Sequence, residues 1–136
     1  MSLDQAANIY RQTIDAGLTT ADAIWLPQDP YTVDQKTILP ELLRAAWSDN
    51  FVVFSSNASH VKRGVLFGLY PDFEKMGASL GRLALDASTG KSIKKTPVQP
   101  LTDVLTAVNL RTADHLGLNL KSDQRDTFDL TFPTSR

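Results

Sequence analysis

Residues 51–70, FVVFSSNASHVKRGVLFGLY, decide the fold. They contain two apolar runs, Phe51–Phe54 and Val65–Leu69, each followed by residues typical of a turn. Short apolar runs rich in valine and phenylalanine predict strands that are buried in a sheet. A third run of this kind, Ala23–Leu26, lies upstream and is also expected to be a buried strand. We expect these three strands to be parallel neighbours in one sheet.

Amphipathic helices are predicted around the first two strands. Apolar residues at helical spacing indicate a helix over residues 4–16. Thr32 and Gln35 have the spacing of a capping box, which predicts a second helix over residues 33–48. Pro40 falls inside this pattern and should shorten or kink the helix, because proline lacks the backbone N–H that a helix interior needs.

A long helix should follow the third strand, beginning at Pro71-Asp72 and ending at Gly90. Its predicted buried stripe consists of Phe73, Met76, Gly77, Leu80, Leu83, Ala84 and Ala87. Beyond it, Val104–Leu110 is expected to be extended, Thr112–Leu116 to form a short helix, and the alternating pattern of Phe128–Phe132 to form an edge strand. Strands separated by helices predict an α/β protein, a three-layer sandwich with a mainly parallel sheet.

Length and composition indicate one globular domain, residues 1–136, with residues 121–136 as a C-terminal tail or edge segment. Apolar residues make up 42% of the chain and charged residues 21%, and the formal net charge is −1. The sequence has no basic stripe that would favour nucleic acid as a partner. It has no cysteine, which excludes disulfides and thiolate chemistry. Because the N-terminus does not resemble a signal peptide, we expect the natural protein to begin further upstream.

Two patterns that could indicate chemistry have structural explanations. Gly77–Gly81 matches the G-x-S-x-G motif of serine hydrolases, but that chemistry needs the serine on a strand-to-helix turn. Here Ser79 should lie inside the long helix, with no histidine within hydrogen-bonding distance. His60 and His115 are far apart and are expected at the surface or at helix ends. We therefore expect no catalytic residue, metal or cofactor.

Polar and aromatic side chains gather where the three predicted strands end. In an open parallel sheet, ligands bind beyond the carboxyl ends of the strands. The candidate ligand-binding residues are Asp29, Tyr31, Ser55, Ser56, Asn57 and Tyr70. One carboxylate, small hydrogen-bonding groups and an aromatic wall suit a small polar ligand with an ammonium group. Such loops are also rich in aspartate, serine and asparagine simply because these residues cap helices. The residues alone leave both interpretations open.

Several stretches resemble the substrate-binding proteins of ABC transporters, a family that includes receptors for aromatic amino acids. The similar segments, in order, are Asp22–Asp29, Phe51–Ser55, Val61–Gly68, Tyr70–Phe73 with Gly77 and the later Gly90–Ser92, and Thr106–Leu118. Together they cover roughly residues 5–120. The loop after Asp29 departs from the family pattern with Pro30-Tyr31, and the tail Phe128–Phe132 differs from the usual last helix.

The resemblance implies the C-terminal lobe of a periplasmic-binding-protein type I fold, with the N-terminal lobe missing from this chain. It implies a solute-binding component of a bacterial transport system, not an enzyme, located in the periplasm or otherwise outside the cytoplasm, with an ABC permease as partner. The ligand would be a small polar molecule such as an amino acid, with Asp29 paired to its ammonium group. A stand-alone α/β sensing or regulatory domain, also possible in the cytoplasm, is the alternative. A lobe without its partner exposes apolar surface, so we expect this chain to self-associate as a homo-oligomer.

Overall fold

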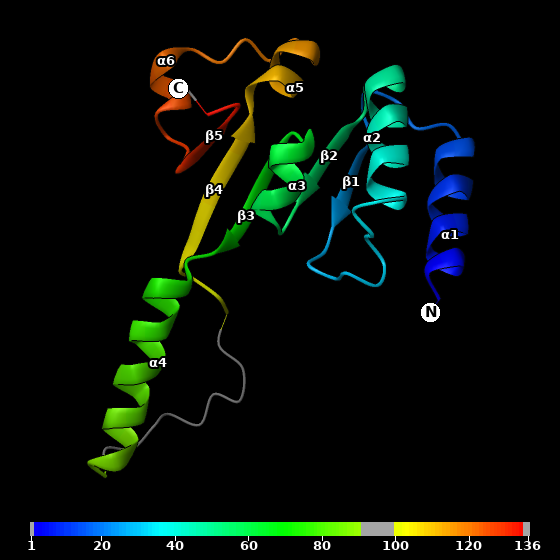
Figure 1. Cartoon of the computed structure of the whole chain (residues 1–136). Helices are drawn as coiled ribbons and strands as arrows, with labels where there is room; N and C mark the ends of the chain where they lie inside the picture. Colours follow the sequence, from blue (N-terminus) through cyan, green and yellow to red (C-terminus); the bar gives the residue numbers. More distant parts are fainter. Residues whose placement is uncertain (1, 91–99, 135–136) are drawn as a thin grey trace.

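A computed structural model describes residues 2–90 and 100–134 and shows a five-stranded sheet flanked by helices (Figure 1). The strands lie side by side in chain order: β1 (Ala23–Leu26), β2 (Val52–Ser55), β3 (Phe67–Pro71), β4 (Val104–Asn109) and β5 (Leu130–Phe132). β1, β2 and β3 are parallel, β4 is antiparallel to β3, and β5 is parallel to β4. The predicted α/β class and the three parallel strands are confirmed.

The described residues form six helices. They are α1 (Leu3–Asp15), α2 (Ile38–Asp49), α3 (Ala58–Arg63), α4 (Phe73–Ser88), α5 (Leu110–His115) and α6 (Ser122–Arg125). α1 lies against α2, α2 contacts β2, and α3 contacts β2, β3 and β4. The expected first helix, the extended β4, the short α5 and the edge strand β5 are all present, whereas α3 and α6 were not predicted.

The core lies between one face of the sheet and the helices α2 and α3. Leu26 and Val53 point to this face and are buried with Leu42 of α2 and Val61 of α3. Successive strand residues point to opposite faces, and Trp25, on the other face, is 58% exposed. The prediction of a fully buried strand is therefore wrong for β1, which is an edge strand of the sheet with one open face.

The second helix begins later than predicted, at Ile38 instead of near residue 33. The Asp34 carboxylate accepts hydrogen bonds from the N–H groups of Lys36 (3.0 Å) and Thr37 (2.7 Å), which holds the preceding loop in a turn. Pro40 is the third residue of α2, where the backbone N–H has no partner within the helix to lose. The expected shortening at Pro40 is confirmed, but Thr32 and Gln35 do not form the predicted capping box.

α3 is the connection that the sequence analysis missed. Asn57 caps it by accepting a hydrogen bond from the Ser59 N–H (2.9 Å), and Gly64 ends it with a φ of 128°. Parallel strands cannot be joined by a tight turn, so β2 and β3 require a crossover. With only six residues, α3 is too short to show a helical period in the sequence.

Gly68 in β3 lies so close to β2 and α3 that a side chain there would clash with them. A Cβ atom there would lie 2.9 Å from the Ser55 carbonyl oxygen and 2.9 Å from Val61 Cγ2. We expect Gly68→Ala to lower the free energy of unfolding by about 1–3 kcal/mol, the usual cost of overpacking. Gly77→Ala is the matched control: nothing lies within 4 Å of its added Cβ, and alanine in a helix is favoured by about 0.8–1.0 kcal/mol. Urea unfolding measures both, and equal effects of the two variants would contradict this account.

α4 extends away from the rest of the molecule and makes no extensive contact with another described element (Figure 1). Asp72 caps it through the Lys75 N–H (3.0 Å), so its predicted start is confirmed, and it stops just before Gly90 as expected. The predicted burial of its apolar stripe is wrong, because no residue of α4 is buried. Phe73 is 63% exposed and Leu80 59%. The stripe therefore has the pattern of a packed helix face but no partner among the described residues.

Candidate functional site

The carboxyl ends of β1 and β2 meet at one edge of the sheet, and an open cavity of about 380 Å³ lies there. It is lined by Gln28, Asp29, Pro30, Val33, Asp34, Gln35, Lys36, Asn57 and His60. Of the six predicted ligand-binding residues, Asp29 and Asn57 line this cavity together. Asp29 comes from the loop after β1, and Asn57 is the cap of α3.

Asp29 is held in position by its own loop. Its Oδ1 accepts a hydrogen bond from the Tyr31 N–H (2.9 Å), and its Oδ2 accepts one from the Thr32 hydroxyl (2.8 Å). These hydrogen bonds lower the pKa of Asp29, so the carboxylate is ionised at neutral pH. Each carboxylate oxygen has a second lone pair for another donor. Asp29 therefore caps its loop and still presents negative charge to the cavity.

The two serines of the predicted site are used within the protein. Ser55 is 1% exposed, because it points to the core face of β2. Its hydroxyl lies within hydrogen-bonding distance of the Leu26 carbonyl (3.2 Å) and of His60 Nδ1 (2.8 Å). The Ser56 hydroxyl accepts a hydrogen bond from the Trp25 indole N–H (3.1 Å). In this structure neither serine lines the cavity.

The predicted aromatic wall is not assembled at the cavity. Tyr31 belongs to the same loop as Asp29, but its side chain is 75% exposed and does not line the cavity. Tyr70 packs beside the hydrophobic core, and burial raises the pKa of its hydroxyl. The tyrosine near Asp29 that the sequence analysis missed is Tyr10 of α1, whose pKa is raised by burial and by the Asp29 charge.

His60 is the polar residue of the site that the sequence analysis did not identify. It lies in the last turn of α3, in line with the expected position at a helix end, but it is not at the surface: it is 3% exposed and lines the cavity. Burial and, to a smaller extent, the charge of Arg63 lower its pKa, so the imidazole is neutral at physiological pH. Asn57 could have indicated this position from the sequence. A helix cap at residue 57 starts a helix whose first turn brings residue 60 back to the end of β2.

The comparisons identify the architecture. No family model matches the chain. A tyrosine-binding protein from Clostridioides difficile is 26% identical over 107 residues, which are 79% of this chain and 30% of that protein. An ABC domain from Streptococcus pneumonia, solved with L-Trp, aligns with a TM-score of 0.62 at 19% identity, covering 96% of this chain and 42% of that one. The ligand-free, open form of a substrate binding protein with adhesive properties from Clostridium difficile aligns with a TM-score of 0.65 at 22% identity. The alignment covers 91% of this chain and 40% of that one.

This chain has the fold of one lobe of a substrate-binding protein. The resemblance stated from the sequence is thereby confirmed. Two of these proteins are binding proteins by name, the tyrosine-binding protein and the substrate binding protein. The chain spans about a third of the curated relative and about two fifths of the solved structures that it matches. No helix in the described part of the lobe is long and apolar enough to cross a membrane.

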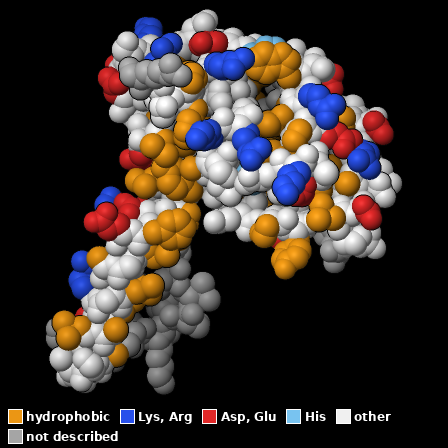
Figure 2. Space-filling model, viewed as in Figure 1, with side chains coloured by type: hydrophobic (Ala, Val, Ile, Leu, Met, Phe, Trp, Pro, Cys, Tyr) orange, Lys and Arg blue, Asp and Glu red, His pale blue; other side chains and the backbone are white. Residues whose placement is uncertain are grey.

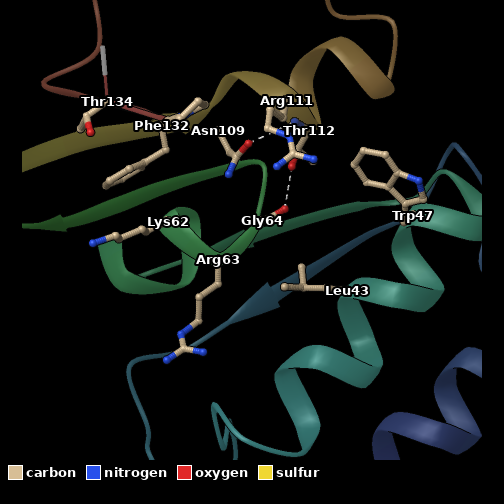
Figure 3. A pocket seen from close by; sticks show the side chains of 11 residues that line it. Leu43, Trp47, Lys62, Arg63, Gly64, Asn109, Arg111, Thr112, Phe132 and Thr134 are labelled. Carbon is tan, nitrogen blue, oxygen red and sulfur yellow. Dashed lines mark hydrogen bonds between the residues drawn. The ribbon is translucent and has the colours of Figure 1, made fainter. Parts of the chain in front are cut away.

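The far end of the lobe has a second cavity, also of about 380 Å³, lined by Leu43, Trp47, Arg63, Arg111 and Phe132 among others (Figure 3). It lies near Gly64, before β3 begins, and is therefore at the opposite end of the parallel strands from Asp29. Figure 3 shows the side chains of Lys62 and Arg63 pointing away from Arg111, so these cations do not converge on one position. The arrangement is a basic rim around an apolar floor and not a preformed ligand site.

Ser79 does not lie on the strand-to-helix turn that a serine nucleophile needs. It lies inside α4, where its hydroxyl donates to Asp103 Oδ2 (3.3 Å) and accepts from Arg82 Nη2 (3.1 Å). As predicted, no histidine hydrogen-bonds to it. Among the residues described in this lobe, no group of three or more histidine, aspartate or glutamate side chains could hold a metal ion.

The stability of the lobe should fall as the pH is lowered through the usual pKa of histidine, about 6.5. Because the pKa of folded His60 lies below its usual value, the unfolded chain binds the proton first and protonation favours unfolding. The loss should begin as the pH falls through about 6.5 and level off below the folded pKa. Aspartates with lowered pKa values, such as Asp29 and Asp34, lose their contribution only at more acidic pH.

Urea-unfolding midpoints across this range measure the effect. His60→Gln should flatten the pH dependence, whereas His115→Gln should retain it. A profile that is unchanged by His60→Gln would show that another group is responsible.

Proposed function

We propose that this chain is the ligand-binding lobe of an extracytoplasmic solute receptor for an amino acid. The observation that carries the proposal is the cavity at the carboxyl ends of β1 and β2, where charged groups of both signs line one space. The ionised Asp29 carboxylate suits an α-ammonium group, and the Lys36 ammonium suits an α-carboxylate. A zwitterion with these two groups matches a cavity with this distribution of charge.

An aromatic side chain on the ligand is consistent with the relatives. The curated relative is a tyrosine-binding protein, and one structural neighbour is solved with L-Trp. In this chain the ring of Pro30 lines the cavity, and the exposed ring of Tyr31 follows it in the loop. A loop movement that brings Tyr31 over the cavity would give an aromatic ligand a surface to stack on.

The ligand would be enclosed by a second lobe that this chain meets. Trp25 and Leu69 are exposed on the open face of the sheet, and Phe73 and Leu80 are exposed on α4. Figure 2 shows apolar side chains continuing from the body of the molecule along α4. A monomeric protein rarely exposes so many large apolar side chains together. We assign this surface to the second lobe and propose an ABC permease as the partner of the complete receptor.

Closure between two lobes predicts a large difference in affinity. In this chain alone the ligand's ion pair stays exposed to water, where such a pair is worth about 0–1 kcal/mol. Binding of L-tyrosine or L-tryptophan should therefore be millimolar or weaker by an order-of-magnitude estimate. A receptor that joins this chain to its second lobe should bind at least about a hundredfold more tightly, a difference of about 2.7 kcal/mol. Calorimetry on both forms tests this, and equal affinities would overturn the two-lobe proposal.

A further inference from the structure

His60 is fixed by a contact that limits where its proton can be. The Ser55 hydroxyl lies 2.8 Å from His60 Nδ1, 3.2 Å from the Leu26 carbonyl oxygen, and 3.1 Å from the Asn57 N–H. A hydroxyl has one hydrogen to donate and two lone pairs that accept. The Asn57 N–H can only donate and the Leu26 carbonyl can only accept, so the remaining choice is the direction of the bond to His60.

The two directions differ in the number of hydrogen bonds that they satisfy. If Nδ1 carries the proton, it donates to Ser55, and the Ser55 hydroxyl donates to Leu26 and accepts from Asn57, which satisfies all three contacts. If Ser55 instead donates to Nδ1, the oxygens of Ser55 and Leu26 face each other without a hydrogen. The Leu26 oxygen would still accept from the Ser56 N–H (3.1 Å), so the cost of this direction is the repulsion between two oxygen atoms 3.2 Å apart. The geometry therefore favours the tautomer with the proton on Nδ1 and a free lone pair on Nε2.

Nε2 is in contact with solvent, and it belongs to a residue that lines the cavity. His60 lines the cavity with Asp29, Asp34 and Lys36, and no described polar atom hydrogen-bonds to Nε2. No side-chain nitrogen or oxygen in the described residues is both buried and without a partner, so Nε2 remains in contact with solvent. A neutral imidazole nitrogen of this kind accepts a hydrogen bond and cannot donate one.

We propose that His60 is a ligand-binding residue whose Nε2 accepts a hydrogen bond from an N–H group of the ligand, beside the Asp29 carboxylate. Ser55 is the positioning residue, because it fixes the ring and its tautomer from the core side. The two acceptors select ligands that carry an ammonium or other N–H donor at this point. They reject an otherwise similar acid without one, because the His60 lone pair would then lose its contact with water and gain no donor. The inference rests on the proposed function.

The ring nitrogens can be observed directly by NMR of the ¹⁵N-labelled chain. In the free protein, His60 should show a protonated Nδ1 and an unprotonated Nε2 near neutral pH. Titration with L-tryptophan should move the Nε2 resonance, whereas indole-3-propionate, which lacks the amino group, should leave it in place. A proton on Nε2 overturns this inference and leaves the proposed function standing. If the amides of residues 28–35 shift but the Nε2 resonance does not, this inference is likewise overturned and the proposed function stands. No shift at any site with either compound overturns both.

Ser55→Ala tests the positioning role, with Ser56→Ala as its matched control. Ser55→Ala should produce a mixture of both tautomers and weaken L-tryptophan binding severalfold. Ser56→Ala removes the neighbouring hydroxyl, which is bonded to Trp25 and not to His60, and should change neither property. An unaltered tautomer in a folded Ser55→Ala protein would contradict the positioning role, and the unmodified protein still reports the tautomer if this variant does not fold.

Discussion

Replacing Leu80 and Leu83 of α4 with aspartate is expected to abolish the self-association of this chain. Both side chains belong to the apolar stripe of α4, and they are 59% and 38% exposed. Burying a leucine is worth about 1.5–3 kcal/mol, and a buried, unpaired carboxylate costs more than that gain. In a symmetric dimer each substitution counts twice, so association should weaken at least about a hundredfold, or about 2.7 kcal/mol.

The folded chain itself should tolerate these substitutions, because α4 has no buried residue. The free energy of unfolding should change by no more than about 0.5 kcal/mol, as is usual for surface positions. Leu85→Asp is the control: Leu85 is 63% exposed, but five residues from Leu80 place it roughly 140° around the helix, off the stripe. Sedimentation equilibrium measures the association. If the variant with both Leu80→Asp and Leu83→Asp associates like the parent, or the parent is monomeric at high concentration, α4 is not a docking surface.

The second large effect concerns Asp29 in the two-lobed receptor. Asp29→Asn keeps an oxygen for the Tyr31 N–H and removes the charge, so the loop should survive while the ligand's ammonium loses its partner. An unpaired charge in a closed cleft costs about 3–5 kcal/mol, which predicts a loss of affinity of at least about a hundredfold.

Asp22→Asn provides the matched control for this loss. The Asp22 carboxylate also holds a loop, accepting from the Thr19 N–H (2.9 Å) and hydroxyl (2.8 Å), but it does not line the cavity. Asp22→Asn should leave the affinity within about twofold of that of the unmodified receptor, a change of less than about 0.5 kcal/mol. Calorimetry with L-tyrosine and L-tryptophan compares the two variants. If Asp29→Asn binds as tightly as Asp22→Asn, Asp29 serves only its loop.

The sheet could be predicted because its signals are local. Three apolar runs with polar ends specify parallel strands, and the same ends led to Asp29 and Asn57. The alternation of side chains along a strand also predicts the position of Ser55. Because Val53 lies on the core face of β2, Ser55, two residues later, must lie on that face too. The serine predicted to bind ligand is thus the residue that holds His60 in place.

The parts that failed depend on contacts beyond the local sequence. The stripe of α4 has the spacing of a buried helix face, but spacing alone cannot show whether anything in the same chain covers it. His60 could not be assigned from composition, because its role depends on Ser55, Leu26 and Asn57 meeting around one hydroxyl. α3, with six residues, gave no period to detect.

The central claim, that the edge beyond β1 and β2 binds an amino acid, is tested most directly by a backbone-amide NMR titration of this chain with L-tryptophan. The predicted result is a set of saturating shifts in residues 28–35 and 57–60, with a dissociation constant in the millimolar range or weaker by order of magnitude. Glucose, which has neither an ammonium nor a carboxylate group, should leave the same amides unmoved. Shifts confined to the far cavity around Trp47 and Arg111, or no saturable shift at all, would contradict the claim.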